Sequence, residues 1–105
     1  MDIDAYLAWL YAHPPVAGMD CAEIAEDFAR KYPGGRITTF RIGARRDIQT
    51  EEFGSRHAWS YHTVYVYGGC VYDGRFAGVA LPYDNYMRHL QALNPGENIG
   101  VTDGG

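Results

Sequence analysis

Three residues in this chain of 105 residues have side chains that could together carry out nucleophilic catalysis: Cys21, His62 and Asp73. A cysteine thiolate attacks carbonyl carbons, a histidine takes up and returns the proton, and a carboxylate orients the imidazole ring. This chemistry works only where the fold brings the three side chains together. The elements that hold each residue therefore decide whether they form a site.

His62 and Asp73 lie in the segment "WSYHTVYVYGGCVYDGRF" (residues 59–76), which has the pattern of a β-hairpin. Gly68-Gly69 is typical of a two-residue turn, and such a turn pairs Val64 with Asp73. Because cross-strand partners point to the same face, we expect Asp73 on the face of His62, diagonally placed at about 7–8 Å between Cα atoms. Hairpins that hold a histidine and an aspartate for structural reasons are common, so a purely structural pair remains the alternative.

Cys21 is expected at the first position of a helix over residues 21–32. Asp20 is a good N-cap, and Glu23 completes a capping-box pattern. The unpaired N–H groups and the dipole at a helix N-terminus favour the thiolate form of a cysteine and can hold an oxyanion. Cys21 also lies on the apolar stripe of this helix, so a small buried side chain is the alternative. Cys70, beside the turn and on the tyrosine face, is interpreted as structural.

This order of a helix-start cysteine, a strand histidine and an aspartate on the next strand resembles the papain-like cysteine hydrolases. It looks most like the compact papain-fold toxin and effector domains of bacteria, which include peptidases and protein-glutamine deamidases. The matching stretches, "GMDCAEIAEDFARKY" and the hairpin segment, cover under half of the chain. The resemblance implies that Cys21 is the nucleophile, His62 the general base and acid, and Asp73 the orienting group, with Trp59 as a neighbour of the site.

The stretch before the cysteine, "AHPPVAG", departs from the pattern of this family. Papain relatives usually carry a glutamine or asparagine there as an oxyanion donor, and this stretch has no side-chain amide. Backbone N–H groups, including that of Cys21, would have to replace it. The remaining steps are those of thiol-dependent amide hydrolysis, and peptide cleavage and deamidation differ only in the amine that leaves. The three residues do not choose between the two reactions.

The other patterns predict an α+β domain, in which the helix that bears the nucleophile packs on a small antiparallel sheet as a minimal papain-like core. Residues 1–93 are expected to form this single domain and residues 94–105 a mobile tail. Residues 44–56 are charged and show no clear period, so we expect a loop. The expected order is α-α-β-β-β-α, with helices over 3–11, 21–32 and 83–93, strands over 36–43, 57–67 and 70–76, and a short extended piece at 76–82.

Composition limits the partners of the chain. A net charge of −4 gives no basic footprint for nucleic acid. No apolar run approaches the length of a membrane span, and the acidic amino end lacks the positive region of a secretory signal. We therefore expect a cytoplasmic protein, or one delivered into a target cell by a specialised secretion system. With no CxxC or HExxH motif, and Cys70 on the opposite face from His62, neither a metal nor another cofactor is expected.

The leading hypothesis is a thiol-dependent hydrolase that acts on amide bonds of a protein substrate. Its resemblance to bacterial effectors and toxins adds a cognate immunity or inhibitor protein as an expected partner. The alternative is a non-catalytic α+β interaction module, an immunity or adaptor protein, that binds a partner through its tyrosine-rich hairpin. Such a tyrosine face is usually core packing under a helix, and it would be a binding surface only if exposed. Its members are Tyr61, Tyr65, Tyr67 and Tyr72.

Overall fold

The computed structural model describes residues 1–13, 19–43 and 46–104, which form a mixed α+β domain. The elements run in the order α1 (Ile3–Ala12), α2 (Cys21–Lys31), β1 (Arg36–Arg41), β2 (Ile48–Glu52), β3 (Ser55–Trp59), β4 (His62–Tyr67), β5 (Cys70–Tyr72), β6 (Leu81–Pro82), α3 (Tyr83–Leu93) and β7 (Gly100–Asp103). Among the described residues, no helix is long and apolar enough to cross a membrane.

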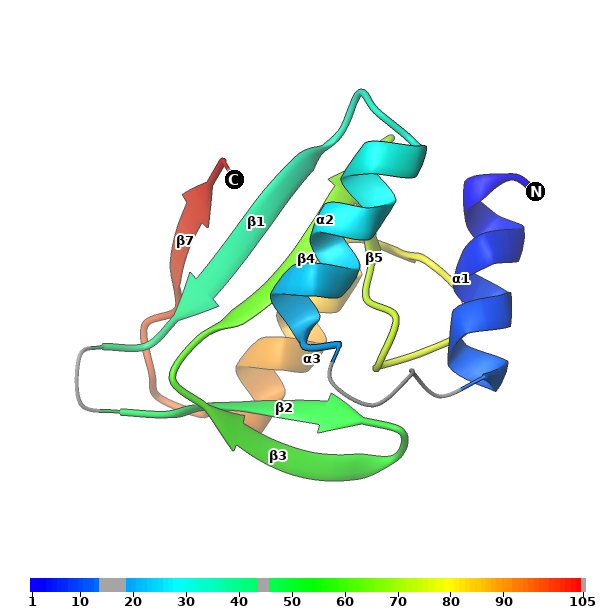
Figure 1. Cartoon of the computed structure of the whole chain (residues 1–105). Coiled ribbons are helices and arrows are strands. Elements are labelled where there is room, and N and C mark those ends of the chain that lie inside the picture. The colour runs from blue at the N-terminus through cyan, green and yellow to red at the C-terminus, as the bar shows by residue number, and fades with distance from the viewer. Residues whose placement is uncertain (14–18, 44–45, 105) are drawn as a thin grey trace.

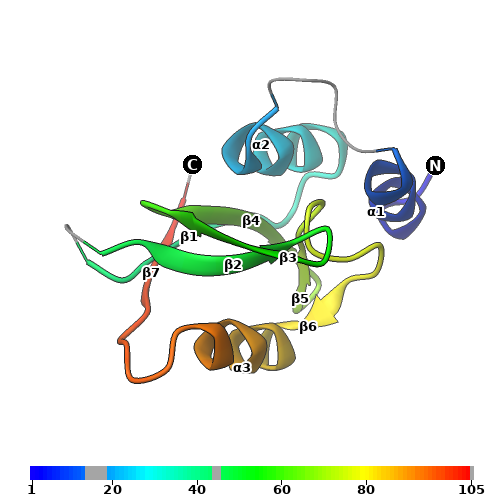
Figure 2. The same ribbon diagram turned by 90° about the horizontal axis from the view of Figure 1, so that it is seen from below.

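The strands form two antiparallel sheets (Figure 1). The larger sheet has five strands in the order β6-β5-β4-β1-β7, and β2 and β3 pair only with each other. Helix α2 covers one face of the five-stranded sheet, with α1 beside it, and α3 covers the opposite face (Figure 2). The sheet therefore separates two hydrophobic cores, which we call the α2-side core and the α3-side core.

The two cores differ in composition. The α2-side core consists of residues from α1, α2, β4 and β5, namely Ile3, Leu7, Leu10, Ile24, Phe28, Tyr65 and Tyr72. The α3-side core is built mainly from aliphatic side chains of the sheet and from α3, namely Phe40, Ile48, Val64, Val66, Val71, Tyr86 and Leu90. Alternation along β4 sends its residues to the two cores in turn, because successive strand side chains point to opposite faces. His62 has the same parity as Val64 and Val66, as the sequence predicts.

Helix α2 begins where the capping pattern predicts. Asp20 accepts a hydrogen bond from the backbone N–H of Glu23 through Oδ1 at 2.9 Å, so Cys21 is the first helical residue. The last predicted helix is also confirmed, since α3 spans Tyr83–Leu93.

The predicted hairpin turn is confirmed, together with the register next to it. Gly68 and Gly69 both have positive φ, at 58° and 78°, which glycine adopts without steric cost. Tyr67 pairs with Cys70, and the two following pairs agree with the prediction. Strand β5 ends at Tyr72, so Asp73 lies immediately beyond the ladder.

Two predictions between the first strand and this hairpin are wrong. Part of the expected loop over 44–56 forms β2 and the start of β3, which are joined by a turn at Phe53-Gly54 with φ of 51° and 80°. The expected strand over 57–67 is two strands, broken at Ser60 and Tyr61. Every residue of β3 is exposed, so the alternation of polar and apolar residues that reveals a half-buried strand is missing there.

The carboxyl end, where the sequence predicts a mobile tail, also contains a strand. Strand β7 pairs with β1 at the edge of the large sheet, and Thr38 Oγ1 donates to Asp103 Oδ1 at 2.8 Å. All four residues of β7 are exposed, which explains the absence of a hydrophobic signal. The extended piece expected at 76–82 is reduced to the two residues of β6.

Candidate active site

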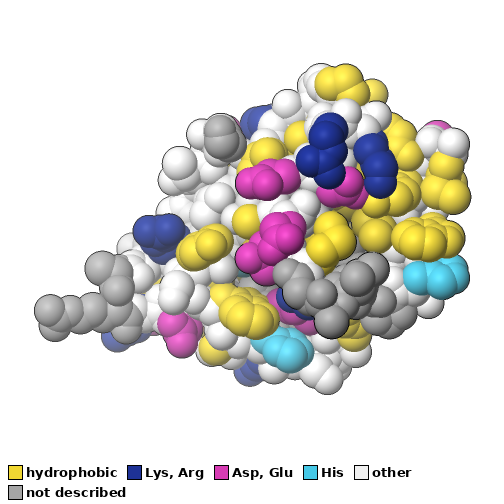
Figure 3. Space-filling view, in the orientation of Figure 1, with side chains coloured by type: hydrophobic (Ala, Val, Ile, Leu, Met, Phe, Trp, Pro, Cys, Tyr) yellow, Lys and Arg dark blue, Asp and Glu magenta, His cyan; other side chains and the backbone are white. Residues whose placement is uncertain are grey.

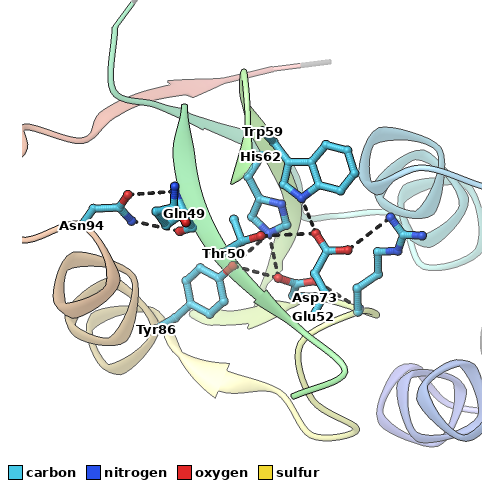
Figure 4. A network of polar contacts seen from close by, with 9 residues as sticks. Gln49, Thr50, Glu52, Trp59, His62, Asp73, Tyr86 and Asn94 are labelled. Carbon is cyan, nitrogen blue, oxygen red and sulfur yellow. Dashed lines mark hydrogen bonds and ion pairs between the residues drawn. The ribbon is translucent and has the colours of Figure 1, made fainter. Parts of the chain in front are cut away.

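His62 and Asp73 form a buried hydrogen-bonded pair at the α3-side core. The ring of His62, the first residue of β4, is fully buried, and Asp73 is 7% exposed. Nε2 of His62 lies 2.8 Å from Oδ2 of Asp73 (Figure 4). The diagonal placement predicted from the hairpin therefore becomes a direct contact between the two side chains.

Tyr86 of α3 completes this pair from the opposite side of the core. Its hydroxyl donates to Asp73 Oδ2 at 2.8 Å and lies 3.1 Å from His62 Nε2 (Figure 4). The other carboxylate oxygen, Oδ1, accepts the backbone N–H of Arg75 at 3.1 Å. Both oxygens of the buried carboxylate are thus hydrogen-bonded, which is the condition for keeping a charge there.

The contacts shift the pKa values of all three groups. Burial raises the pKa of Asp73, but the charge and hydrogen bond of His62, with the bonds from Tyr86 and Arg75, outweigh burial and lower it. Burial lowers the pKa of His62, but the charge and hydrogen bond of Asp73, followed by the contribution of Cys21, raise it to about 10. Burial and the neighbouring Asp73 charge raise the pKa of Tyr86 well above its ordinary value, so its hydroxyl keeps its proton.

Cys21 lies close enough to the imidazole of His62 to help raise its pKa. Nδ1 of His62 is buried and has no hydrogen-bond partner in the part of the chain that the structure describes, so no hydrogen bond joins the ring to the sulfur. Since Nε2 is occupied by Asp73, the nitrogen that could exchange a proton with the sulfur is Nδ1.

A pocket of about 190 Å³ opens next to the sulfur, and it is lined by Asp20, Cys21, Trp59, Ser60, Tyr61 and Arg75. Two aromatic side chains form part of its wall: Trp59, the last residue of β3, and Tyr61, which lies between β3 and β4. A larger pocket of about 400 Å³ is lined by residues between 42 and 49 and between 93 and 97. The larger pocket contains none of the candidate catalytic residues, so the smaller one is the candidate substrate site.

Glu52, at the end of β2, is a second buried carboxylate beside the pocket. It is 4% exposed and accepts hydrogen bonds through Oε2 from the indole N–H of Trp59 and from Thr50 Oγ1, the latter at 3.2 Å (Figure 4). Its Oε1 lies 3.3 Å from Nη1 of Arg75. Two of these three partners, Trp59 and Arg75, line the pocket, so Glu52 fixes two of its walls.

The structure thus brings together most of the residues singled out from the sequence. His62 and Asp73 are bonded, and Cys21 and Trp59 line the adjoining pocket. Cys70 packs against the α2-side core, among the tyrosines. The stretch before Cys21 in which an amide donor is missing lies mostly outside the described residues, at 14–18. Among the described residues, no three His, Cys, Asp or Glu side chains are grouped so that they could hold a metal ion.

Three residues of the site were missed: Glu52, Arg75 and Tyr86. Glu52 falls in the stretch interpreted as a loop, and Tyr86 falls on the apolar stripe of α3, where a tyrosine normally indicates packing. Arg75 follows Asp73 by two residues, a spacing typical of an aspartate that accepts a backbone N–H in a turn, and this was the one available signal. No known protein family, curated protein or solved structure matches this chain.

Proposed function

We propose that this chain is a small thiol-dependent hydrolase that acts on amide bonds of a protein substrate. Cys21 would be the nucleophile, His62 the general base and acid, and Asp73 the group that orients the imidazole. The observation that supports this proposal is the buried, hydrogen-bonded pair of His62 and Asp73, which lies beside Cys21. The second ring nitrogen of His62 has no hydrogen-bond partner among the described residues. Cys21 opens helix α2 and lines a pocket.

The raised pKa of His62 bears on the resting state. With a pKa of about 10, the imidazole carries a proton at neutral pH. An imidazolium beside a cysteine favours the nucleophilic thiolate form. The thiolate attacks the amide carbon, and the imidazolium gives its proton to the leaving nitrogen as the C–N bond breaks. Water then attacks the resulting thioester, His62 accepts a proton from it, and the products are a carboxylate and the regenerated sulfur.

The leaving amine distinguishes the two reactions within this proposal. Departure of a peptide amine is proteolysis, and departure of ammonia from a glutamine side chain is deamidation. A papain-like fold and an origin as a bacterial effector or toxin domain belong to the same proposal, and they rest on the resemblance of two stretches. The alternative is partner binding through the tyrosine-rich hairpin, in which Tyr65 and Tyr72 are 1% and 6% exposed and Tyr61 is 41% exposed, so only part of the tyrosine face is available for binding.

Thiol labelling tests the proposal without knowledge of the substrate. At pH 6, we expect Cys21 to react with iodoacetamide much faster than Cys70 does in the same molecule, as measured by peptide mass spectrometry. His62→Gln should remove the difference, because the imidazolium that favours the thiolate is lost. Equal rates for the two cysteines in the unmodified chain would overturn the proposal.

The reaction itself can be followed by the intact mass of a candidate substrate. A gain of roughly one dalton without cleavage indicates deamidation, whereas fragments indicate proteolysis. Either product should disappear with Cys21→Ala. A product that persists in this variant would show that Cys21 is not the nucleophile.

A further inference from the structure

Arg75 is held in a fixed position beside the candidate nucleophile. Its backbone N–H donates to Asp73 at 3.1 Å, its carbonyl accepts the N–H of Phe53 at 2.8 Å, and its Nη1 lies 3.3 Å from Glu52. The side chain is 22% exposed, and Glu52 beneath it is 4% exposed. Arg75 is therefore held through its backbone and through its guanidinium, and it also lines the pocket that contains Cys21.

The hydrogen-bonding capacity of this guanidinium is only partly used. A guanidinium has five N–H donors, and its contact with Glu52 is single and long rather than bidentate. Nε is buried and has no hydrogen-bond partner among the residues that the structure describes. A cation that served only to neutralise Glu52 would be expected to pair through two donors, as arginine and carboxylate groups usually do. The guanidinium of a residue that lines the pocket thus has donors that Glu52 does not use.

The charges around the pocket determine what these donors can bind. Arg75 contributes a positive charge that Glu52 partly offsets, and Asp20 contributes a negative charge at the rim, where its carboxylate also caps α2. The pocket therefore has a donor-rich wall at Arg75 and an acidic wall at Asp20, with the aromatic ring of Trp59 as a further wall.

We propose that Arg75 is a substrate-binding residue that donates hydrogen bonds to an acceptor oxygen of a carboxylate or carboxamide on the acyl group that Cys21 attacks. This inference rests on the proposed function, because it concerns the substrate of the same site. It assigns the substrate to a class: the acyl side of the scissile amide carries an oxygen acceptor within reach of the pocket. Glu52 then acts as a positioning residue, which holds Arg75 and Trp59 in place.

Three small thiol reagents test the assignment. Iodoacetate and iodoacetamide both transfer a two-carbon group as the thiolate displaces iodide, and they carry a carboxylate and a carboxamide, respectively. Dimethyl disulfide has no oxygen and reports the reactivity of the sulfur alone. We expect Arg75→Gln to slow the reaction of Cys21 with the oxygen-bearing reagents by about fivefold relative to dimethyl disulfide, the effect of losing one charge-assisted hydrogen bond in a partly exposed site.

The pattern of loss identifies the acceptor. Slowing confined to iodoacetate indicates a carboxylate, and equal slowing of both iodo reagents indicates a neutral oxygen acceptor. Cys70 in the same molecule should show no change with any reagent. Arg88→Gln, the same substitution at an exposed position of α3, should leave all three rates at Cys21 unaltered. Asp20→Asn keeps an N-cap oxygen but removes the rim charge, so it should accelerate iodoacetate.

Two results would count against the inference, and they differ from each other. If Arg75→Gln is folded by circular dichroism and leaves the rates of both iodo reagents relative to dimethyl disulfide unchanged, Arg75 has a structural role only, and the proposed function stands. If Cys21 reacts with dimethyl disulfide no faster than Cys70 in the unmodified chain, the proposed function fails, and the substrate class fails with it.

Discussion

Two buried tyrosines lie on opposite faces of the central sheet, and their hydroxyl groups have different partners. Tyr65 of β4 lies in the α2-side core, where it donates to the carbonyl of Tyr32 and accepts the N–H of Gly35 at 2.9 Å. Tyr86 of α3 lies in the α3-side core, where it donates to a buried carboxylate that also holds a buried histidine. One hydroxyl satisfies backbone groups of a connection, and the other belongs to a network of side chains.

This difference bears on which tyrosine belongs to the proposed site. Backbone groups left by the end of a helix must be paired, so the contacts of Tyr65 have a structural purpose. An isolated charged pair in an apolar core costs more in desolvation than its attraction returns, and apolar residues of similar volume are often as stable there. Apolar residues in place of His62 and Asp73 would therefore serve the fold about as well as the pair does. Their burial at the start of β4, beside a cysteine, favours a functional explanation.

The surface over α1 has a different character from the candidate site. Figure 3 shows hydrophobic side chains gathered over α1, and the stacked rings of Tyr6, Trp9 and His13 belong to this helix. Trp9 is 46% exposed. These rings stack on one another along the helix, and the buried carboxylate next to them, Asp27, bonds to Tyr6 and to exposed basic side chains rather than to a buried histidine. The contrast between the two sides can be tested by substitutions matched in type.

The largest effect is expected from Asp73→Asn. Without the carboxylate, burial dominates and the pKa of His62 falls below its ordinary value, so the imidazole is neutral at pH 7. Reactivity of Cys21 towards iodoacetamide at pH 6 should fall by about a hundredfold, the usual size of a general acid–base contribution. Asp27→Asn is a matched control, because Asp27 is also 7% exposed but bonds to Tyr6, Arg30 and Lys31 on α1 and α2. It should leave Cys21 unaffected.

The same variant should change how stability depends on pH. The pKa of His62 is about 10 in the folded chain and 6.5 for an ordinary histidine, so the folded state binds more protons between these values. The stabilisation from His62 is therefore complete below pH 6.5 and is lost as the pH rises through about 10. Urea unfolding across this range should show that loss in the unmodified chain and not in Asp73→Asn. An unchanged slope in the variant would contradict the ion pair.

Tyr65→Phe tests the structural member of the tyrosine pair. The substitution leaves the N–H of Gly35 and the carbonyl of Tyr32 without their partner, and the loss of a hydrogen bond in a partly exposed position costs about 0.5–1.5 kcal/mol. We expect a lower free energy of unfolding in urea and an unchanged pH profile of Cys21 alkylation. A shifted profile would show that the two faces are coupled and would weaken the division between them.

Tyr86→Phe tests the other member of the tyrosine pair. We expect it to show mainly in the pH profile of Cys21 alkylation and only weakly in the free energy of unfolding. The Tyr86 hydroxyl helps to lower the pKa of Asp73, so its removal raises that pKa. Because the carboxylate must remain charged to hold the imidazolium, the acid limb of Cys21 alkylation should move to higher pH by less than about one unit. Tyr65→Phe is the matched control. Identical pH profiles for the two variants would reduce Tyr86 to a packing residue.

The sequence predicts the parts of this fold that carry local signals. The cap at Asp20 locates the first residue of α2, and the glycine pair locates the turn and register of the β4–β5 hairpin. These two features are enough to place Cys21 at a helix start and Asp73 near His62. Both depend on residues next to one another in the chain, and local chemistry decides them.

The missed parts depend on contacts between distant segments. Strands β3 and β7 are exposed at every residue, and each is formed by pairing with a neighbour rather than by burying a face. In the sequence, Glu52 looks like a solvated charge, and only the fold brings Trp59 and Arg75 to it. Tyr86 looks like a core residue, and only the packing of α3 brings it to His62 at the start of β4. A substrate pocket made of such residues has no signature in local spacing.

The smallest effect is expected at the second cysteine. Cys70 begins β5, pairs with Tyr67 across the turn and packs at the margin of the α2-side core, so its thiol faces the structural side of the sheet. Cys70→Ser keeps nearly the same volume at a half-buried position, and the free energy of unfolding should fall by no more than about 1 kcal/mol. Cys21 alkylation and the proposed amide hydrolysis should be retained, whereas the equivalent Cys21→Ser should abolish both. Equal losses of activity in the two serine variants would remove the functional distinction between the faces. Cys70 of the hairpin would then be as necessary for activity as Cys21, which lies beside His62.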